Sequence, residues 1–405
     1  MKKLKVLFPR VEAGFGHIMT CNAVEEIFTK KYGKYFEVLN FDFYKSCPDK
    51  TVQKYGKVLM DQVELYTSHP AIGHLITGSC EFFGTTFSSW FGLHFPRPWQ
   101  VKKAIKYLES LKPDVIYSTH WATNYYAEHM KENKPFTIMY CPDAYLNKMF
   151  KYKADLTLCS MENGLEEAKK DKHFDSSNLK LVPFCIRNSA FDLKDTKIQS
   201  RKKLGISNRF TVVLTEGGYG NGKMPKIIKR LLKLDLPINI VAICGKNAKL
   251  AEKMKTYEVG KNTSFVPLGF VKNIFEYINS ADLFCGKAGN MIAEPTFFGV
   301  PSIVSGLSTG IENHIADYYA DYAKCAIIET NYKKATDLIV YYFNNPDKLN
   351  VLKENAIKHH THFGAEGAAD LIFKEICKRF NLEVKLWITQ KLSVWFLAFY
   401  LEFTP

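Results

Sequence analysis

Three glycine-rich turns are the features of this sequence best suited to holding a phosphorylated ligand. They span residues 14–17, 217–222 and 286–289, and each follows an apolar run and precedes a helical pattern. Glycine lets the backbone approach a phosphate closely, and a helix N-terminus supplies oriented N–H donors and positive potential. None of the turns matches the full dinucleotide fingerprint or the Walker A lysine pattern. Any one of them could be an ordinary tight turn, so the prediction of phosphate binding depends on their combination.

Three titratable side chains could act on a bound substrate. His17 closes the first glycine turn, and an imidazole with a pKa of about 6.5 can remove a proton at neutral pH. His120 and Asp143 follow later apolar runs, and we expect them at the same edge of a sheet, where they would position an acceptor or its base. Each has a plainer interpretation as well. His17 could simply line a helix start, and the other two could be ordinary polar residues at strand ends.

The elements that must position these residues alternate between short apolar runs and helical patterns, which is typical of βαβ units in a parallel sheet. Strands are predicted in the first half of the chain at residues 4–8, 36–40, 115–117, 137–140 and 156–158. A polar, charged stretch at 188–208 is interpreted as the interdomain connection. A second series of strands is predicted at residues 210–214, 238–244, 264–266, 282–284 and 302–304.

The pattern therefore predicts an α/β protein with two doubly wound parallel sheets, in domains spanning residues 1–190 and 191–380. In such sheets ligands bind at the carboxyl ends of the strands, where glycine-rich turns meet helix N-termini. Two sheets that face one another would place a cleft between them.

A longer set of motifs resembles the GT-B glycosyltransferases of one family. Glu294 lies one turn into the helix predicted after Gly289. The other motifs of the set are at residues 14–17, 118–120, 141–143, 244–247, 268–271, 295–301 and 310–313. This combination is similar to the family 28-like group that contains monogalactosyldiacylglycerol synthases and processive diacylglycerol glucosyltransferases. The N-acetylglucosaminyltransferase of peptidoglycan precursors belongs to the same family. The resemblance runs from residue 4 to about residue 375.

The resemblance implies a UDP-sugar donor site in the second half of the chain. Glu294 would accept hydrogen bonds from the ribose hydroxyls, and Glu312 would contact the sugar. The uracil would be flanked by Gly269, Phe270 and Val271, and the diphosphate would be cradled by Gly217, Gly218, Ala288, Gly289 and Asn290. His17 would be the general base for the acceptor hydroxyl, as in inverting members of the family. No metal or cofactor is expected, because backbone amides and helix N-termini can stabilise the departing diphosphate.

Two departures from the family pattern leave the donor sugar open. Residues 286–289 read Gly-Lys-Ala-Gly where the family often has Lys-Pro-Gly-Gly. Ile311 replaces a glutamine, and Ile315 stands where an asparagine is common. Three alternatives therefore remain beside hexose transfer to a diacylglycerol-type lipid. They are N-acetylglucosaminyl transfer to a polyprenyl-linked precursor, a sugar-nucleotide epimerase of the same fold, and a non-catalytic membrane-binding protein on this scaffold.

Charge and aromatic content favour an anionic membrane surface over nucleic acid as the partner. The formal net charge is +14, from 55 Lys and Arg against 41 Asp and Glu. Residues 82–99 are rich in Phe and Trp and are followed by Lys102, Lys103 and Lys106. Such a segment suits the interface of an anionic bilayer, although it could instead be a core-packing insertion. The aromatic tail, residues 381–405, could be an interfacial helix or could pack on the first domain.

The remaining composition indicates a reduced, cytosolic chain, and the resemblance to lipid-using family members implies that it acts peripherally at the cytoplasmic face of the membrane. The ten cysteines are scattered and form neither a zinc pattern nor a disulfide framework. The first apolar run is too short for a signal peptide, and no run of about 18 apolar residues could span a bilayer.

Overall fold

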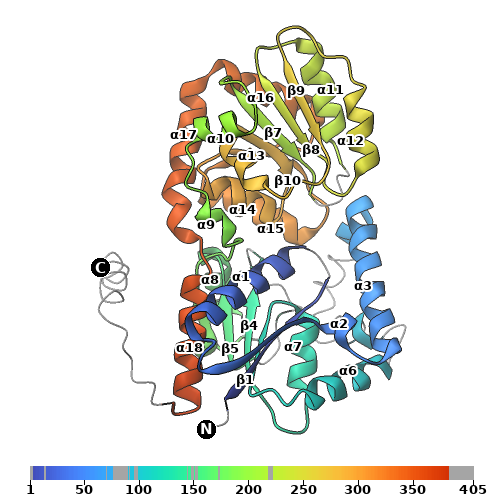
Figure 1. Cartoon of the computed structure of the whole chain (residues 1–405), viewed down its shortest axis with the longest axis vertical. Coiled ribbons are helices and arrows are strands. Elements are labelled where there is room, and N and C mark those ends of the chain that lie inside the picture. The colour runs from blue at the N-terminus through green and yellow to red at the C-terminus, as the bar shows by residue number, and fades with distance from the viewer. Residues whose placement is uncertain are drawn as a thin grey trace.

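The computed structural model describes residues 3–12, 15–69, 71–75, 90, 92–94, 99–143, 145–146, 150, 154–171, 174–217 and 222–382. The molecule consists of two halves stacked along its long axis, each built on one sheet with helices on both faces (Figure 1). This arrangement confirms the predicted α/β class with two doubly wound sheets.

The first sheet has six parallel strands in the order β2-β1-β3-β4-β5-β6. Their bounds are β1 Leu4–Arg10, β2 Phe36–Asp42, β3 Val115–Ser118, β4 Phe136–Cys141, β5 Leu156–Cys159 and β6 Leu179–Leu181. β1 continues through Pro9, beyond the predicted end at Phe8. It pairs with β3 only at Val6 and Leu7, so the missing N–H of the proline falls outside that ladder.

The second sheet also has six parallel strands, in the order β12-β11-β10-β7-β8-β9. Their bounds are β7 Thr211–Thr215, β8 Asn239–Ile243, β9 Ser264–Leu268, β10 Leu283–Lys287, β11 Ser302–Gly306 and β12 Ala326–Ile328. Every residue of β7 and β8 is buried, as expected for parallel strands that are covered by helices on both faces.

The described helices of the first half are α1 Phe15–Tyr32, α2 Phe43–Ser46, α3 Lys50–Ser68, α6 Trp99–Ser110, α7 Trp121–Glu128 and α8 Glu162–Lys170. Those that follow are α9 Ser189–Asp192, α10 Lys197–Lys203, α11 Met224–Leu234, α12 Ala248–Lys255, α13 Ile274–Ser280, α14 Asn290–Phe297, α15 Gly310–Asp317, α16 Tyr332–Asn344, α17 Pro346–Lys358 and α18 Glu366–Arg379. No helix among these is both long enough and apolar enough to cross a membrane.

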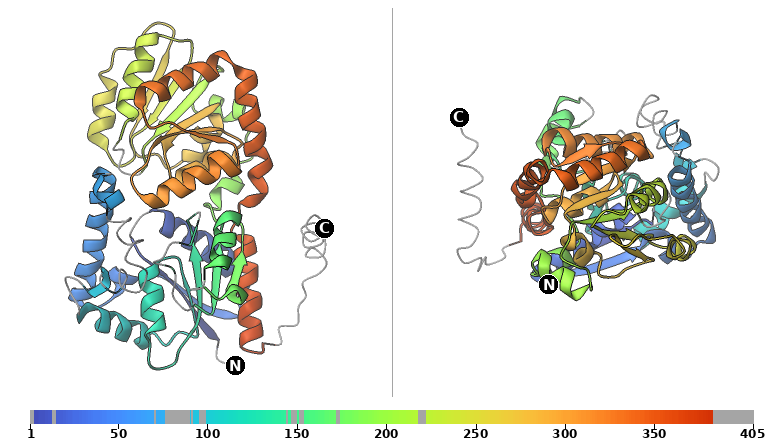
Figure 2. Two further views of the ribbon diagram at one scale, coloured as in Figure 1. Left: turned by 180° about the vertical axis from the view of Figure 1, so that it is seen from behind. Right: turned by 90° about the horizontal axis from the view of Figure 1, so that it is seen from above.

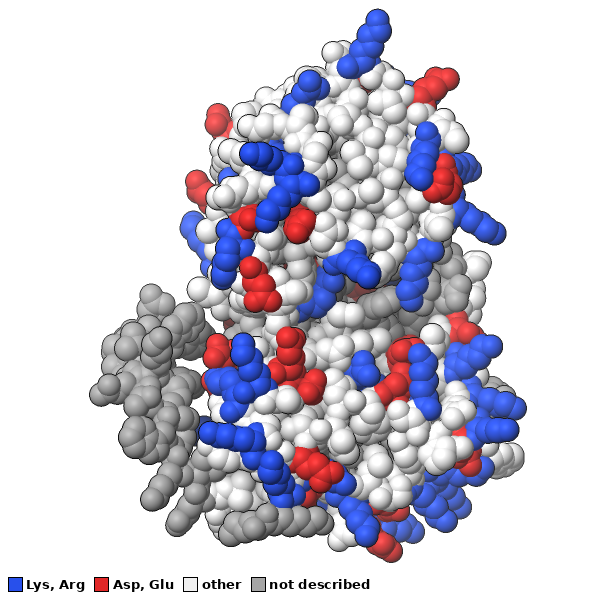
Figure 3. All heavy atoms as spheres, in the orientation of Figure 1, with Lys and Arg blue, Asp and Glu red and all other residues white. Residues whose placement is uncertain are grey.

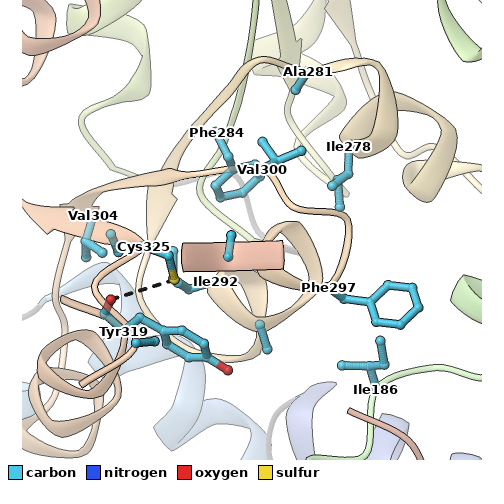
Figure 4. Packing of buried hydrophobic residues seen from close by; sticks show 14 of the residues in the cluster. Ile186, Ile278, Ala281, Phe284, Ile292, Phe297, Val300, Val304, Tyr319 and Cys325 are labelled. Carbon is cyan, nitrogen blue, oxygen red and sulfur yellow. Dashed lines mark hydrogen bonds between the residues drawn. The ribbon is translucent and has the colours of Figure 1, made fainter. Parts of the chain in front are cut away.

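The predicted interdomain connection, 188–208, contains structure of its own. α9 and α10 lie within it, and a Thr196–Gln199 capping box starts α10. Arg201 of α10 is buried and its Nη2 is 2.5 Å from Asp282, so this helix is attached to the second domain. Ile186, just before this connection, also packs with the second domain, because it belongs to the core cluster that contains Phe297 (Figure 4).

The last described helix, α18, packs with the first domain, whereas the predicted division assigned residues 191–380 to the second domain. It leaves the second domain after α17 and runs along the first sheet, as Figure 1 and the left view of Figure 2 show. Ala368, Ile372 and Ile376 are buried against strands of that sheet, and Phe373 stacks on Tyr32 of α1 at a centroid distance of 3.9 Å. The first domain therefore includes a helix from the far end of the chain. The predicted aromatic tail lies outside the described residues from position 383 onward.

Candidate active site

The switch point of the first sheet brings two of the predicted site residues together. The strand order reverses between β1 and β3, and ligands bind at such a point beyond the carboxyl ends of the strands. His17 follows β1 in the first turn of α1, and His120 follows β3 as the N-cap of α7. Their rings meet edge to face with centroids 5.1 Å apart.

His17 is held in one tautomer by the backbone after β3. Its Nδ1 lies 2.6 Å from the carbonyl oxygen of Thr119, and a carbonyl can only accept a hydrogen bond. Nδ1 therefore carries the proton, and Nε2 keeps a free electron pair. Burial lowers the pKa of His17 below 6.5, although the bond to Thr119 acts in the opposite direction. A neutral imidazole with an available Nε2 is the form that a general base requires.

His120 has a clear structural role in addition to any contact with substrate. Its Nδ1 accepts a hydrogen bond from the backbone N–H of Ala122 at 3.1 Å, which caps α7. Only 3% of the residue is exposed, and burial lowers its pKa well below the ordinary value. Positioning of the acceptor by His120 remains a prediction.

Asp143 lies beyond the carboxyl end of β4, which is the neighbour of β3 in the sheet. Its carbonyl oxygen accepts a hydrogen bond from Ser160 Oγ at 3.3 Å. The three predicted catalytic residues thus follow β1, β3 and β4, which are adjacent strands. A catalytic role for Asp143 remains a prediction.

In the second sheet, which carries the predicted donor site, the strand order reverses between β10 and β7. Gly217 follows β7 with a φ of +81°, and Gly289 follows β10 with a φ of +119°, values that favour glycine. Gly289 is the N-cap of α14, and a Cβ built on it would meet no atom within 4 Å. The first N–H groups of α14 have no intrahelical partner, so this open helix start can receive an anion. Asn290 is the first residue of the helix, and Gly218 lies outside the described residues.

Ala288 is placed differently from its neighbours in the predicted diphosphate cradle. Its backbone N–H donates to the carbonyl oxygen of Gly306 at 2.9 Å, and its side chain is buried in the core. The N–H group of Ala288 is therefore already used in a hydrogen bond of the sheet. The contacts with a diphosphate would fall to Gly289 and the start of α14.

Glu294 lies in the second turn of α14 and is 9% exposed. Its Oε1 accepts hydrogen bonds from Nε and Nη2 of Arg187, at 2.9 Å and 2.7 Å. Burial raises the pKa of Glu294, while the Arg187 guanidinium opposes that shift. Arg187 was not predicted as a site residue. The one feature of the sequence that could have pointed to Arg187 is its position directly after the apolar run at residues 181–186.

Glu312 is already engaged at both carboxylate oxygens. Its Oε1 forms an ion pair with Nζ of Lys287 at 2.7 Å, and Oε2 accepts a hydrogen bond from the N–H of Ser308. Lys287 is one of the residues that depart from the family pattern. A contact between Glu312 and the sugar remains a prediction, and it would have to share or replace these partners.

The predicted uracil-binding residues follow β9. Phe270 is 66% exposed, so its ring is open to a ligand, while Val271 packs against the core. Gly269 lies next to the carbonyl of Gly245, 4.0 Å from the position that a Cβ would take. Contact of these residues with a base remains a prediction.

A buried carboxylate in the second glycine turn was not predicted as a site residue. Glu216 is 3% exposed, and its Oε1 accepts hydrogen bonds from the N–H groups of Lys223 and Met224, both at 2.9 Å. Burial raises the pKa of Glu216 to about 7. A Cβ on Gly222 would come within 2.4 Å of the carboxylate, so glycine is required there. The available signal in the sequence was an acidic residue immediately after the strand Thr211–Thr215, which ends at the glycine turn.

Among the described residues, no group of three or more His, Cys, Asp or Glu side chains could hold a metal ion. Nine of the cysteines lie in the described ranges, and all nine are free thiols.

Comparison with known protein families finds a match in the half of the chain that carries the predicted donor site. Residues 221–369 match the model of the glycosyltransferase family 28 C-terminal domain. The second half of this chain is thus similar to a family 28 C-terminal domain. The matched region contains β10, the open start of α14 and Glu294. The resemblance inferred from sequence motifs is confirmed for this region, whereas the roles of its site residues remain predictions.

Relatives of this chain include enzymes named for lipid substrates. The processive diacylglycerol beta-glucosyltransferase of Bacillus pumilus is 28% identical over 186 residues, which cover 45% of this chain and 48% of the relative. The corresponding enzyme of Bacillus subtilis is 27% identical, and 46% of its length is covered. The match thus spans about half the length of these relatives. Monogalactosyldiacylglycerol synthase 3 of Arabidopsis thaliana is 25% identical over 381 residues, covering 87% of this chain and 77% of the synthase.

Solved structures that contain a similar pair of domains establish the fold. MurG of Acinetobacter baumannii superposes with a TM-score of 0.58 at 14% identity, over 92% of this chain and all of that one. The MnaA–UDP structure of S. aureus gives a TM-score of 0.59 at 13% identity, over 94% of this chain and 98% of that one. The fold that carries the family 28 domain is the GT-B fold.

Proposed function

We propose that this protein is a UDP-sugar-dependent hexosyltransferase that transfers a hexose to a diacylglycerol-type lipid. In this proposal it binds the cytoplasmic face of the membrane as a peripheral protein. The observation that carries the proposal is the start of α14. There an open glycine N-cap, Gly289, is followed one turn later by the buried carboxylate of Glu294, inside the region that matches family 28.

The donor would bind with its diphosphate at the start of α14 and its ribose at Glu294. A helix N-terminus attracts an anion, and a carboxylate can accept hydrogen bonds from two vicinal hydroxyls. Structures of similar fold include Anabaena HepE in complex with UDP and glucose, at 12% identity and a TM-score of 0.55. This likeness supports a nucleotide site in this fold and leaves the donor sugar open.

The chemical step would be an inverting displacement in which His17 acts as base. Nε2 of His17 removes the proton from the acceptor hydroxyl while the hydroxyl oxygen attacks the anomeric carbon. The bond between that carbon and the diphosphate oxygen breaks, and UDP departs with the electron pair. The N–H groups at the start of α14 stabilise the charge that develops on the diphosphate. The Nδ1–H bond to Thr119 supports this role because it leaves Nε2 unprotonated.

A lipid acceptor is supported by the named substrates of the relatives and by the surface of the first domain. Leu75 and Trp90, which lie in the chain between α3 and α6, and Trp99, the first residue of α6, are 75%, 48% and 67% exposed. The same two helices carry exposed lysines at positions 50, 54, 57, 102, 103 and 106. Figure 3 shows many cationic side chains over this part of the molecule. Exposed rings beside cations suit the headgroup layer of an anionic bilayer. Most of the predicted interfacial segment, residues 82–89, 91 and 95–98, lies outside the described residues.

The decisive experiment is turnover by the purified protein with a panel of donors and acceptors. UDP-glucose, UDP-galactose and UDP-N-acetylglucosamine would each be offered with diacylglycerol liposomes, with a polyprenyl-linked precursor, and with no acceptor. We expect a glycosylated diacylglycerol and stoichiometric UDP from one of the hexose donors. Product only on the polyprenyl precursor would favour the N-acetylglucosaminyltransferase. Epimerised donor without acceptor would favour an epimerase, and donor binding with no turnover in any arm would favour a non-catalytic protein.

A further inference from the structure

Arg187 reaches the proposed donor site from the connection between the two domains. It follows β6 and precedes α9, and its guanidinium contacts a residue of α14 that is 107 positions away in the chain. Its Nε and Nη2 both donate to the same atom, Oε1 of Glu294, at 2.9 Å and 2.7 Å. None of the described residues donates a hydrogen bond to Oε2. One carboxylate oxygen is therefore fixed, and the other has capacity for a ligand.

The environment of Glu294 requires a counterion if the carboxylate is to stay charged. The side chain is 12% exposed, and burial raises its pKa. A buried carboxylate without a partner would take up a proton, because desolvation disfavours its charged form. A protonated acid would present one acceptor oxygen fewer to the ribose. The guanidinium is always charged, so it can keep Glu294 ionised throughout the physiological range.

Arg187 is itself held in place on two sides. Its guanidinium lies over the ring of Phe275 in α13 at 4.3 Å from the centroid. The next residue, Asn188, donates from Nδ2 to the carbonyl oxygen of Ala23 in α1 at 2.8 Å. A side chain fixed in this way can orient the carboxylate that it contacts.

We propose that Arg187 is a positioning residue for the nucleotide-sugar donor: it holds Glu294 through Oε1 and presents Oε2, ionised, to the ribose hydroxyls. This inference rests on the proposed function, because it assigns a second residue to the same donor site. A purely structural ion pair between the connection and α14 would produce the same contact. The positioning role and the purely structural role predict different results when Arg187 is replaced. Only the positioning role makes donor binding by the variant depend on pH.

The test measures UDP-glucose binding by calorimetry from about pH 5.5 to about pH 8.5 for the wild type, Arg187→Gln, Arg187→Lys and Glu294→Gln. UDP-glucose is chosen because both of its phosphates are diesters and keep a constant charge over this range. Removing the cation raises the pKa of Glu294, so binding to Arg187→Gln should be lost as the pH falls through that raised value. We expect Arg187→Gln to bind about 10-fold more weakly than the wild type at neutral pH and to recover as the pH rises. Arg187→Lys keeps the charge without the planar fork, so it should follow the wild-type pH profile at an affinity lower by a few-fold.

Arg230→Gln is the matched control, because it removes another arginine–carboxylate pair of the same domain, with Asp337 at 2.8 Å. A pH profile of Arg187→Gln identical to that of the wild type would overturn the proposal, even if the variant were less stable to heat. If Arg187→Gln does not fold, the lysine variant decides, and wild-type affinity in that variant would overturn the geometric role. Unchanged binding by Glu294→Gln would instead contradict the donor site itself, and with it the proposed function.

Discussion

The loop after β3 and the first turn of α1 are joined by two hydrogen bonds between Thr119 and His17. The carbonyl oxygen of Thr119 accepts from Nδ1 of His17 at 2.6 Å, and Oγ1 of Thr119 donates to the carbonyl oxygen of His17 at 2.8 Å. Two segments that are 102 residues apart are thereby fixed to one another at the switch point of the sheet. The imidazole has one allowed tautomer as a result, and its Nε2 is the atom available to a substrate.

Replacing His17 by alanine should remove the base and leave the donor site intact. A positioned base contributes about 10²–10⁴ in rate, so kcat should fall by that factor while the affinity for UDP stays unchanged. The wild-type rate should decrease as the pH falls through a histidine pKa below 6.5, because only the neutral ring can accept the proton. Steady-state kinetics across pH measure both effects. A His17→Ala enzyme that kept near-normal kcat and the same acidic limb would rule the residue out and leave Asp143 and His120 as candidates.

Replacing Glu294 by alanine should weaken donor binding without unfolding the protein. The loss of hydrogen bonds to a charged acceptor costs about 1.5–3 kcal/mol. Calorimetry with UDP measures the loss, and the thermal transition shows whether the domain is intact. Equal affinity of the variant and the wild type for UDP would be incompatible with a donor site at α14.

Replacing Trp90 and Trp99 by serine should reduce binding to anionic liposomes. Both rings are exposed, so the fold and UDP binding should be unaffected. Burying such a side chain contributes on the order of 1.5 kcal/mol or more, so the double variant should partition at least about 10-fold less. Co-sedimentation measures the partition, and added salt should weaken it further if the lysines of α3 and α6 contribute. Ile198→Ser is the control, because Ile198 is 62% exposed on the second domain. An equal loss of liposome binding in both variants would argue against a specific membrane face.

Replacing Glu162 by glutamine should destabilise the protein more at mildly acidic than at alkaline pH. Glu162 of α8 lies 3.0 Å from Nε2 of His362, in the segment between α17 and α18. This contact raises the pKa of His362. Burial acts to raise the pKa of Glu162, but its hydrogen bonds, above all that from His362, lower it to about 2.

The stability from Glu162 is present above its unfolded pKa of about 4.5 and is lost as the pH falls toward 2. The stability from His362 is present below about 6.5 and is lost as the pH rises through its raised value. We therefore expect Glu162→Gln to lower the free energy of unfolding most between these limits. The side chains are 28% and 37% exposed, so the effect should be about 1 kcal/mol after solvent screening. Denaturant unfolding at about pH 6 and about pH 8.5 measures it, with Glu166→Gln on the same helix as the control. A loss that is equal at both pH values would count against the ion pair.

Replacing Glu216 by glutamine should change how stability depends on pH. Because burial raises the pKa of Glu216 to about 7, ionisation of this group subtracts stability as the pH rises from its unfolded value of about 4.5. The subtraction is complete above the folded pKa and amounts to about 3 kcal/mol at most. Glutamine can still accept the two backbone hydrogen bonds, so the variant should gain on the wild type as the pH rises. Unfolding free energies measured at about pH 5 and about pH 8 test this, and a constant difference would contradict it.

Much of the fold could be predicted because parallel strands covered on both faces are rich in apolar and β-branched residues. β7 and β8 are of this kind, and both were predicted within one residue of their observed ends. The short edge strands β6 and β12 have three residues each, too few to show a period, and neither was predicted. The same limit applies to contacts across the sequence. The glycine turns and Glu294 follow from local motifs, whereas the pairing of Arg187 with Glu294 depends on how the connection folds against α14.

The return of α18 to the first domain has a consequence for how the protein is made. Its residues Ala368, Ile372, Phe373 and Ile376 complete the core on one face of the first sheet. A ribosome releases the N-terminal strands long before these residues, and domains generally fold in the order in which they emerge. α1 packs into the same cluster, but the part of that face that α18 covers stays exposed until α18 has been synthesised. A chain that stops before α18 would keep its donor domain and lose the helix that closes the other half.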